Sequence, residues 1–156
     1  MRKLIVLLNV LAIILTACGT GKAAESKVLT GYMVIDGDKL YLDEVEIVER
    51  EDTDRISELK LGESDMPGGY FIRDLEEERL EFELSNKTTY TFVDFNMLFI
   101  KDEKADRLYT TDKKDEFIEH LETSYYDSPP AQRVPFFVEI KEGKVINITE
   151  EFSFTI

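Results

Sequence analysis

The sequence predicts an α+β domain that is mainly antiparallel β, folded as a curved sheet or small open barrel with two short helices. The first reason is that apolar and polar residues alternate with a period of two in several segments, as in strands with one wet face. The second is that glycine-containing turns separate such segments, and the third is that two other segments carry helix-cap signals. Although 33% of the residues are charged, 43% are hydrophobic, which argues against disorder.

An N-terminal hairpin is expected over residues 28–48. Its inward residues are two with odd numbers, Met33 and Ile35, and two with even numbers, Leu40 and Leu42. The pairs lie opposite each other, on one face, if Gly37-Asp38 makes a two-residue type II′ turn. The inward parity then changes to Val45 and Ile47, which predicts a β-bulge or a sharp bend near Asp43-Glu44.

A short helix is expected over residues 52–61. Asp52 or Thr53 can cap its start, and Gly62 can end it. Its narrow apolar edge consists of Ile56 and Leu59.

Turns and strands alternate in the segment that follows this helix. A turn is expected over residues 65–69, because proline lacks an N–H donor and glycine permits positive φ. One strand is expected to begin at Tyr70, and a second to run from Leu80 to Leu84 with glutamates on its wet face. Asn86-Lys87 predicts the next turn.

Residues 90–100 carry apolar side chains on both faces, which predicts a central strand, or two short ones, covered on both sides. Asp94 and Asn96 interrupt this apolar run. They either face a pocket or bond to backbone at a bend, and the bend is the favoured interpretation. Residues 101–107 are expected to form a charged loop.

A second helix is expected to be capped by Asp112 and to run to about Glu122. Its buried face is expected to contain Phe117, Ile118, Leu121 and, at the end, Tyr125. His120, the only histidine, flanks this face and is expected to be structural and partly exposed.

The last hairpin is expected to follow the break at Ser128-Pro129-Pro130. Its inward residues all have even numbers: Phe136, Val138, Ile140, Ile146, Ile148, Phe152 and Phe154. Even-numbered residues can lie opposite each other across a hairpin only if the loop has an odd number of residues. We therefore predict a three-residue Lys141-Glu142-Gly143 turn with Gly143 in the left-handed position of a G1 bulge. This register places Val138 opposite Ile146.

The chain begins with Arg2 and Lys3, followed by an apolar run that is broken only by Asn9. As a helix, the run to Ala17 would span roughly 21 Å, short of the roughly 30 Å hydrocarbon core of a bilayer. It therefore predicts a secretory signal rather than a mature transmembrane span. We expect a signal peptide over residues 1–17 that is removed, a flexible tether over 18–27, and one β-rich globular domain over 28–156.

Leu15-Thr16-Ala17-Cys18 resembles the lipobox of bacterial lipoproteins. The resemblance implies that the thiol of Cys18 receives a diacylglycerol and that Cys18 becomes the first residue after cleavage. The acyl chains would then hold the protein on the extracytoplasmic face of the cell membrane. Cys18 is the only cysteine, so no intrachain disulfide can form.

The domain itself is similar to uncharacterised lipoproteins of spore-forming Gram-positive bacteria. The similarity lies in short blocks over residues 31–36, 40–47, 65–70 and 90–95. It implies the same placement outside the cell membrane, and no activity, ligand or functional residue.

The formal net charge is −14, and residues 43–83 hold 16 carboxylates against five basic residues. Such a surface repels DNA, RNA and anionic lipid headgroups, so no nucleic-acid partner is expected. It suits a cationic partner, divalent ions or simply solubility, and solubility alone is sufficient to explain it.

The sequence gives little support to catalysis, and we expect neither an enzyme nor a cofactor. A single histidine, no Gly-x-Ser-x-Gly elbow and no glycine-rich phosphate loop argue against the common hydrolase and nucleotide sites. Asp36, Asp38 and Asp43 are candidate Ca²⁺ ligands, although their spacing differs from that of an EF-hand and turn chemistry also explains Asp36-Gly37-Asp38.

The leading hypothesis is therefore a non-catalytic binding or interaction module, tethered outside the membrane, whose partner is a protein or a cell-envelope component. The alternative is a divalent-cation-binding cell-envelope protein. A hydrolase is the third.

Overall fold

The computed structural model describes residues 25–75, 78–102, 106–124 and 134–150. Its strands are β1 (Lys27–Asp36), β2 (Lys39–Glu49), β3 (Tyr70–Asp74), β4 (Leu80–Glu83), β5 (Thr89–Val93), β6 (Leu108–Thr111), β7 (Phe136–Lys141) and β8 (Lys144–Glu150). Its helices are α1 (Thr53–Leu59) and α2 (Lys114–Ser124), and a 3-10 turn, Glu63–Asp65, follows α1. A mainly antiparallel β-sheet with two short helices confirms the predicted fold class.

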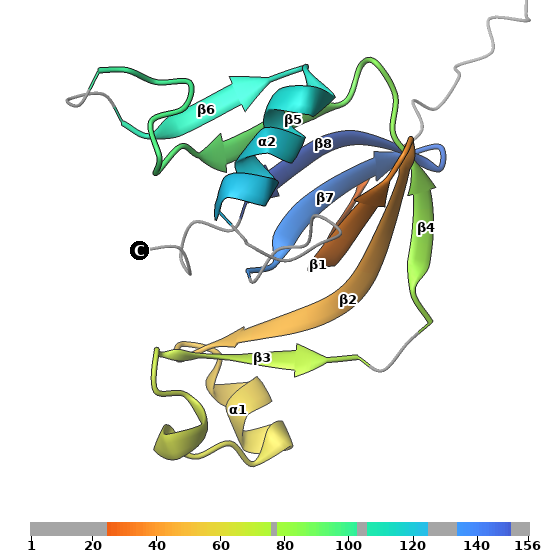
Figure 1. The fold of residues 1–156 in the computed structure, drawn as a ribbon. Coiled ribbons are helices and arrows are strands. Elements are labelled where there is room, and N and C mark those ends of the chain that lie inside the picture. Colours follow the sequence, from red (N-terminus) through yellow and green to blue (C-terminus); the bar gives the residue numbers. More distant parts are fainter. Residues whose placement is uncertain (1–24, 76–77, 103–105, 125–133, 151–156) are drawn as a thin grey trace, which may run out of the picture.

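The strands follow the order β3-β2-β1-β7-β8-β5-β6, and β4 pairs with both β2 and β8. Hydrogen bonds between neighbouring strands therefore form a closed ring through β1, β2, β4, β8 and β7. β4 meets β8 at one position, Glu83 opposite Lys144, so this ring is not a clean barrel. In Figure 1, β2 curves away from the ring, and together with β3 and α1 it forms a projection below the rest of the domain.

The hydrophobic core fills the ring and is covered by α2, which contributes Phe117 and Leu121. Tyr90 of β5 stacks on Phe117 with ring centroids 4.7 Å apart. Burial, and after it the charge of Asp38, raises the pKa of Tyr90 to about 12. The other members of this core are Leu29, Met33, Ile35, Leu40, Leu42, Leu84, Phe92, Phe136, Val138, Ile140, Val145 and Ile148.

The first hairpin has the predicted register, with Ile35 opposite Leu40 and Met33 opposite Leu42. Gly37 has φ of 57° and Asp38 is not left-handed, as a type II′ turn requires. The inward parity changes after Leu42 as predicted, since Leu42 and Val45 are both buried, but the next buried residue is Val48 and not the predicted Ile47. The registers show no bulge there: β2 leaves β1 after Glu44 and pairs with β3 instead.

The last hairpin differs from the prediction. Its turn has two residues, since Lys141 pairs with Lys144, and Glu142 and Gly143 are both left-handed, with φ of 53° and 77°. This is the backbone of a type I′ turn. An irregularity between Glu139 and Ile140 then leaves one extra residue on β8, so Val138 faces Ile148 and not Ile146.

The predicted long strand over 90–100 is also wrong in extent. β5 ends at Val93, and the following loop leads to β6, a strand that was not predicted from the sequence and that begins directly after the predicted charged loop. The predicted turns over residues 65–69 and at Asn86-Lys87 are confirmed, as are the strands β3 and β4.

Both helices are present with shifted ends. The Asp52 side chain accepts from Arg55 N–H and caps α1 as predicted, but the helix ends at left-handed Lys60 and not at Gly62. α2 begins at Lys114. The Thr111 hydroxyl, and not the predicted cap Asp112, accepts from the backbone N–H of Lys113 just before the helix. Tyr125 and the break at 128–130 lie outside the described residues. Across the described ranges, no helix combines the length and apolarity needed to cross a bilayer.

Candidate functional site

A cleft of about 840 Å³ lies where β2 separates from β1, within the size range of small-ligand and peptide sites. β1 and β7 contribute Thr30 and Phe137, which are register partners. β2, the turn to α1, α1 itself and the end of β3 supply the rest: Glu44, Val45, Glu46, Ile47, Glu49, Glu51, Asp52, Arg55, Arg73 and Leu75.

Gly31 marks the point at which the two strands separate. It is the last residue of β1 opposite β2, and it also faces Phe136 of β7. A Cβ added to Gly31 would lie 2.3 Å from the carbonyl oxygen of Asp43, so only glycine allows the two backbones to approach this closely. Beyond this point, β1 pairs with β7 and β2 pairs with β3.

Among the described residues, the separation leaves one edge of β2 open. From Val45 to Glu49, β2 pairs with β3 on one side only, and no described strand lies along its other edge. This open edge lines the cleft. Unpaired strand edges are sites at which another chain can add a strand.

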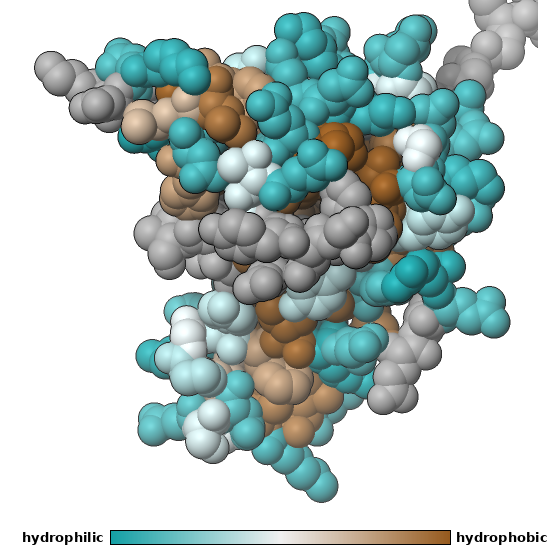
Figure 2. Space-filling model, in the orientation of Figure 1, coloured by the Kyte–Doolittle hydropathy of each residue, from teal (hydrophilic) through white to brown (hydrophobic). Residues whose placement is uncertain are grey.

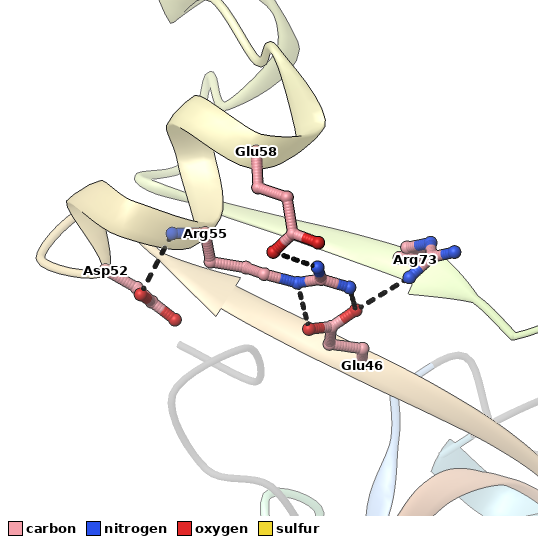
Figure 3. A network of polar contacts seen from close by, with 5 residues as sticks. All are labelled: Glu46, Asp52, Arg55, Glu58 and Arg73. Atoms are coloured by element: carbon pink, nitrogen blue, oxygen red, sulfur yellow. Dashed lines mark hydrogen bonds and ion pairs between the residues drawn. The ribbon is translucent and has the colours of Figure 1, made fainter.

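An ion-pair network joins α1 to the two-stranded ribbon of β2 and β3 beside the cleft (Figure 3). Arg55 of α1 binds Glu46 of β2 through two parallel bonds, Nε to Oε1 at 2.6 Å and Nη2 to Oε2 at 2.7 Å. Glu58 lies 2.5 Å from Nη1 of the same guanidinium, and Arg73, the register partner of Glu46 on β3, donates to Glu46 at 3.2 Å. Helix and ribbon are thus joined by one carboxylate.

These contacts set the charge state of Glu46. Hydrogen bonding to Arg55 lowers its pKa, and Arg73 adds to this, while burial opposes it. The same bonds to Glu46 and Glu58 raise the pKa of Arg55. Glu46 and Arg55 therefore neutralise each other across the physiological range.

The remaining acids of the cleft differ from Glu46 in their contacts. For Glu44, Glu49 and Glu51, no ion pair occurs among the described residues, whereas Asp52 caps α1. Between these acids lie apolar side chains, and Figure 2 shows hydrophobic residues gathered over the β2–β3 ribbon and bordered by hydrophilic ones. The lining of the cleft therefore combines apolar side chains with acidic ones, and we refer to Glu44, Glu49 and Glu51 as its acidic rim.

The three acids proposed from sequence as Ca²⁺ ligands have separate positions and partners. Asp38 is 84% exposed in the hairpin turn and lies 2.6 Å from Lys114 Nζ, and Asp36 is exposed beside the same turn. Asp43 lies five residues further along β2, roughly 17 Å away, and binds Arg79 through two bonds of 2.8 Å. Within the described part of the chain, no three acid, cysteine or histidine side chains are grouped to hold a metal ion.

His120 belongs to a second polar cluster, in the core. It was expected to be partly exposed and is only 1% exposed. Its Nε2 lies 3.5 Å from Oε2 of Glu150, its Nδ1 lies 3.3 Å from Oγ of Ser124, and its ring stacks on Phe92.

A hydroxyl, an imidazole and a carboxylate in this order are the groups of a hydrolase triad. Here the two contacts exceed the range of about 2.6–3.2 Å typical of such sites, and the imidazole and the Glu150 carboxylate are closed to solvent. Glu150 also accepts from the N–H of Val93 at 2.7 Å. We interpret this cluster as a structural link between α2, β5 and β8.

Neither polar group could be recognised from the sequence, for a physical reason. Glu46, Arg55 and Arg73 come together through the β2–β3 register and the fold of α1, and no local motif marks them. Glu150 did leave a signal, because it occupies an inward position in a strand whose other inward residues are apolar. Cys18, the predicted lipidation site, lies outside the described residues.

Comparison with protein-family models, with curated proteins and with solved structures gave no match.

Proposed function

We propose that the chain is a lipid-anchored extracytoplasmic lipoprotein whose domain acts as a non-catalytic binding module. The cleft beside β2 is the observation that carries the binding role, because it combines apolar side chains with a strand edge and acids that have no partner among the described residues. The lipobox-like Leu15-Thr16-Ala17-Cys18 supports the placement, as does the similarity to lipoproteins of Gram-positive spore formers.

The anchor is tested by replacing Cys18 with alanine in the full chain. One acyl chain holds a protein only weakly, whereas two or three hold it firmly, so the wild type should sediment with membranes. The variant should be released or remain as an uncleaved precursor. Membrane retention of a processed C18A chain would contradict the anchor, and an intact mass that includes the lipid would support it.

The binding role is tested on intact cells with a photo-crosslinking amino acid. Placed at Thr30, which lines the cleft, it should capture a partner. The same probe at Thr110, an exposed residue of β6, should not, because β6 lies away from β2 and β3 in Figure 1. Equal capture at both positions, or none at Thr30, would argue against the cleft as the binding surface.

A further inference from the structure

We propose that the cleft binds an extended, basic peptide segment of a partner protein, which adds a strand to the open edge of β2. This inference rests on the proposed binding role and specifies the chemistry of the partner. It follows from the backbone of β2, from the charges of the cleft and from its dimensions.

The backbone of β2 directs hydrogen-bonding groups into the cleft. Alternate residues of a strand direct their N–H and C=O groups to opposite edges. Arg50 N–H donates to Gly69 O on the β3 side, so the odd-numbered residues Val45, Ile47 and Glu49 direct theirs to the other edge. An added strand can satisfy these groups.

The charges of the cleft select a basic partner. Five carboxylates line it against two guanidinium groups, and both guanidinium groups bind Glu46. Glu44, Glu49 and Glu51, which form no ion pair with another described residue, can therefore interact with incoming cations. In a cleft partly shielded from water, such contacts fix the register of a bound chain and speed its association.

The dimensions suit a short extended segment. The open edge from Val45 to Glu49 spans roughly 17 Å, which matches about five residues of a strand. Ile47, Leu75 and Phe137 lie among the acids and can receive apolar side chains that alternate with basic ones. The expected ligand thus alternates lysine or arginine with aliphatic residues.

A second copy of this chain is a poorer occupant. Pairing the open edges of two copies would set acidic rims against each other, and like charges opposite each other destabilise strand pairs. The net charge of −14 adds to this repulsion.

The test uses the full chain in a zwitterionic detergent and a capped, fluorescent Lys-Val-Lys-Val-Lys-Val-Lys peptide. Fluorescence anisotropy should show saturable binding that weakens as salt is raised. Two matched peptides separate charge from backbone pairing: one carries glutamate for lysine, and the other is N-methylated at alternate amides. Both should bind at least about tenfold more weakly.

Two variants place the binding on β2. Ile47→Pro removes an N–H that faces the open edge and keeps the pairing with β3, since proline is accepted at such edge positions. The double variant Glu49→Lys, Glu51→Lys reverses the charge of the rim. Each should weaken binding about tenfold, whereas Glu119→Lys, Glu122→Lys, on the exposed face of α2, should leave it within about twofold.

Absence of peptide binding, or binding unaffected by N-methylation and by the rim variant, would overturn the inference. A dimer that dissociates in the Ile47→Pro variant would also overturn it, by assigning the edge to a second copy. If the peptide fails and the Thr30 probe still captures a partner, the binding role stands and only the ligand chemistry is wrong. If both fail, the proposed function fails as well.

Discussion

At the scale of single residues, Asp94 shapes the loop that follows β5. Its carboxylate is 1% exposed and accepts three backbone N–H groups, from Leu98 at 2.9 Å, Phe99 at 2.9 Å and Ile100 at 2.7 Å. Burial by itself raises its pKa, but these three donors, with a contribution from His120, lower it overall. The interpretation of Asp94 as a residue that bonds to backbone at a bend is thereby confirmed.

Asp94→Asn should destabilise the domain by about 2–3 kcal/mol at neutral pH, because the amide offers one acceptor oxygen to three buried donors. A carboxylate whose pKa is lowered by folding stabilises the native state above its unfolded pKa of about 4, and this contribution is lost as the pH falls further. The free energies of unfolding of the two proteins should therefore converge below about pH 4. Urea titrations at several pH values measure this, and a constant difference down to pH 2 would contradict it.

Gly31→Ala should cost about 2–3 kcal/mol, because the new Cβ would overlap backbone atoms of Asp43 that cannot rotate away. Gly62→Ala is the matched control. Its Cβ would meet its nearest neighbour, the Asp65 carboxylate, at 3.6 Å, so the change should stay within about 0.5 kcal/mol. Thermal unfolding of both variants measures the difference, and equal stability would mean that β1 and β2 cross elsewhere.

Single residues also show where sequence reasoning stops. Carboxylates are usually exposed, so no burial was predicted for Glu150. Its even number nevertheless places it on the same face as the inward residues of its strand. Its burial depends on Val93 and His120, which lie 57 and 30 positions away and reach it only in the folded state.

At the scale of elements, the parity of inward residues predicts only whether the loop residues and any unpaired strand residues together are even or odd in number. The first hairpin fits its simplest solution, a two-residue turn. In the last hairpin, a three-residue loop and a two-residue loop followed by one extra residue on β8 place Val138 and Ile148 on the same side, so parity cannot separate them. The buried Val145 distinguishes the two, because only the shorter turn places it opposite Ile140.

Helix α1 depends on its salt bridges. It has seven residues, none of them buried, and a helix this short does not persist in water by itself. Arg55→Gln should therefore loosen α1 while the ring stays intact. Hydrogen exchange of the α1 amides should rise roughly tenfold, with no change in β5 or β7.

Arg79→Gln is the control for this prediction. Arg79 makes an equally paired contact with Asp43 but lies apart from α1, so α1 exchange should not respond. Since pairing with Arg55 lowers the pKa of Glu46, the wild-type helix should itself loosen as the pH falls below about 4. Protection of the α1 amides from exchange, relative to the unfolded chain, that stays constant across that pH range would count against the network.

At the scale of the whole molecule, the ring closes through a small contact between β4 and β8. Beside it, the buried hydroxyl of Thr88 donates to Val145 O at 2.8 Å and accepts from Ser85 N–H at 3.0 Å. Thr88→Val keeps the shape but leaves both groups unpaired, which should cost about 2 kcal/mol. Thr88→Ser should cost less than half of that, and a reversed order of the two in denaturant unfolding would contradict this account.

The strand order and the cleft could not be predicted from the sequence. β5 runs parallel to β8 and reaches it from 58 residues away, through Thr89 opposite Asn147. No local pattern encodes such a pairing, and the cleft exists only because β2 exchanges one neighbour for another midway. Local periodicity therefore predicted the class of fold and most strands, and left the binding surface open.

The position of β1 has a mechanical consequence for a tethered protein. The proposed anchor joins the domain at Lys27, the start of a strand that lies inside the sheet and bonds to β7 along its first half and to β2 along its second. A pull between the membrane and a partner held on β2 would act across the open end of the β1–β2 hairpin, because Lys27 and Val45–Glu49 both lie beyond the Gly31–Glu44 pair, away from the turn. Such a pull would load the bonds next to Gly31 first and would open the hairpin toward its turn.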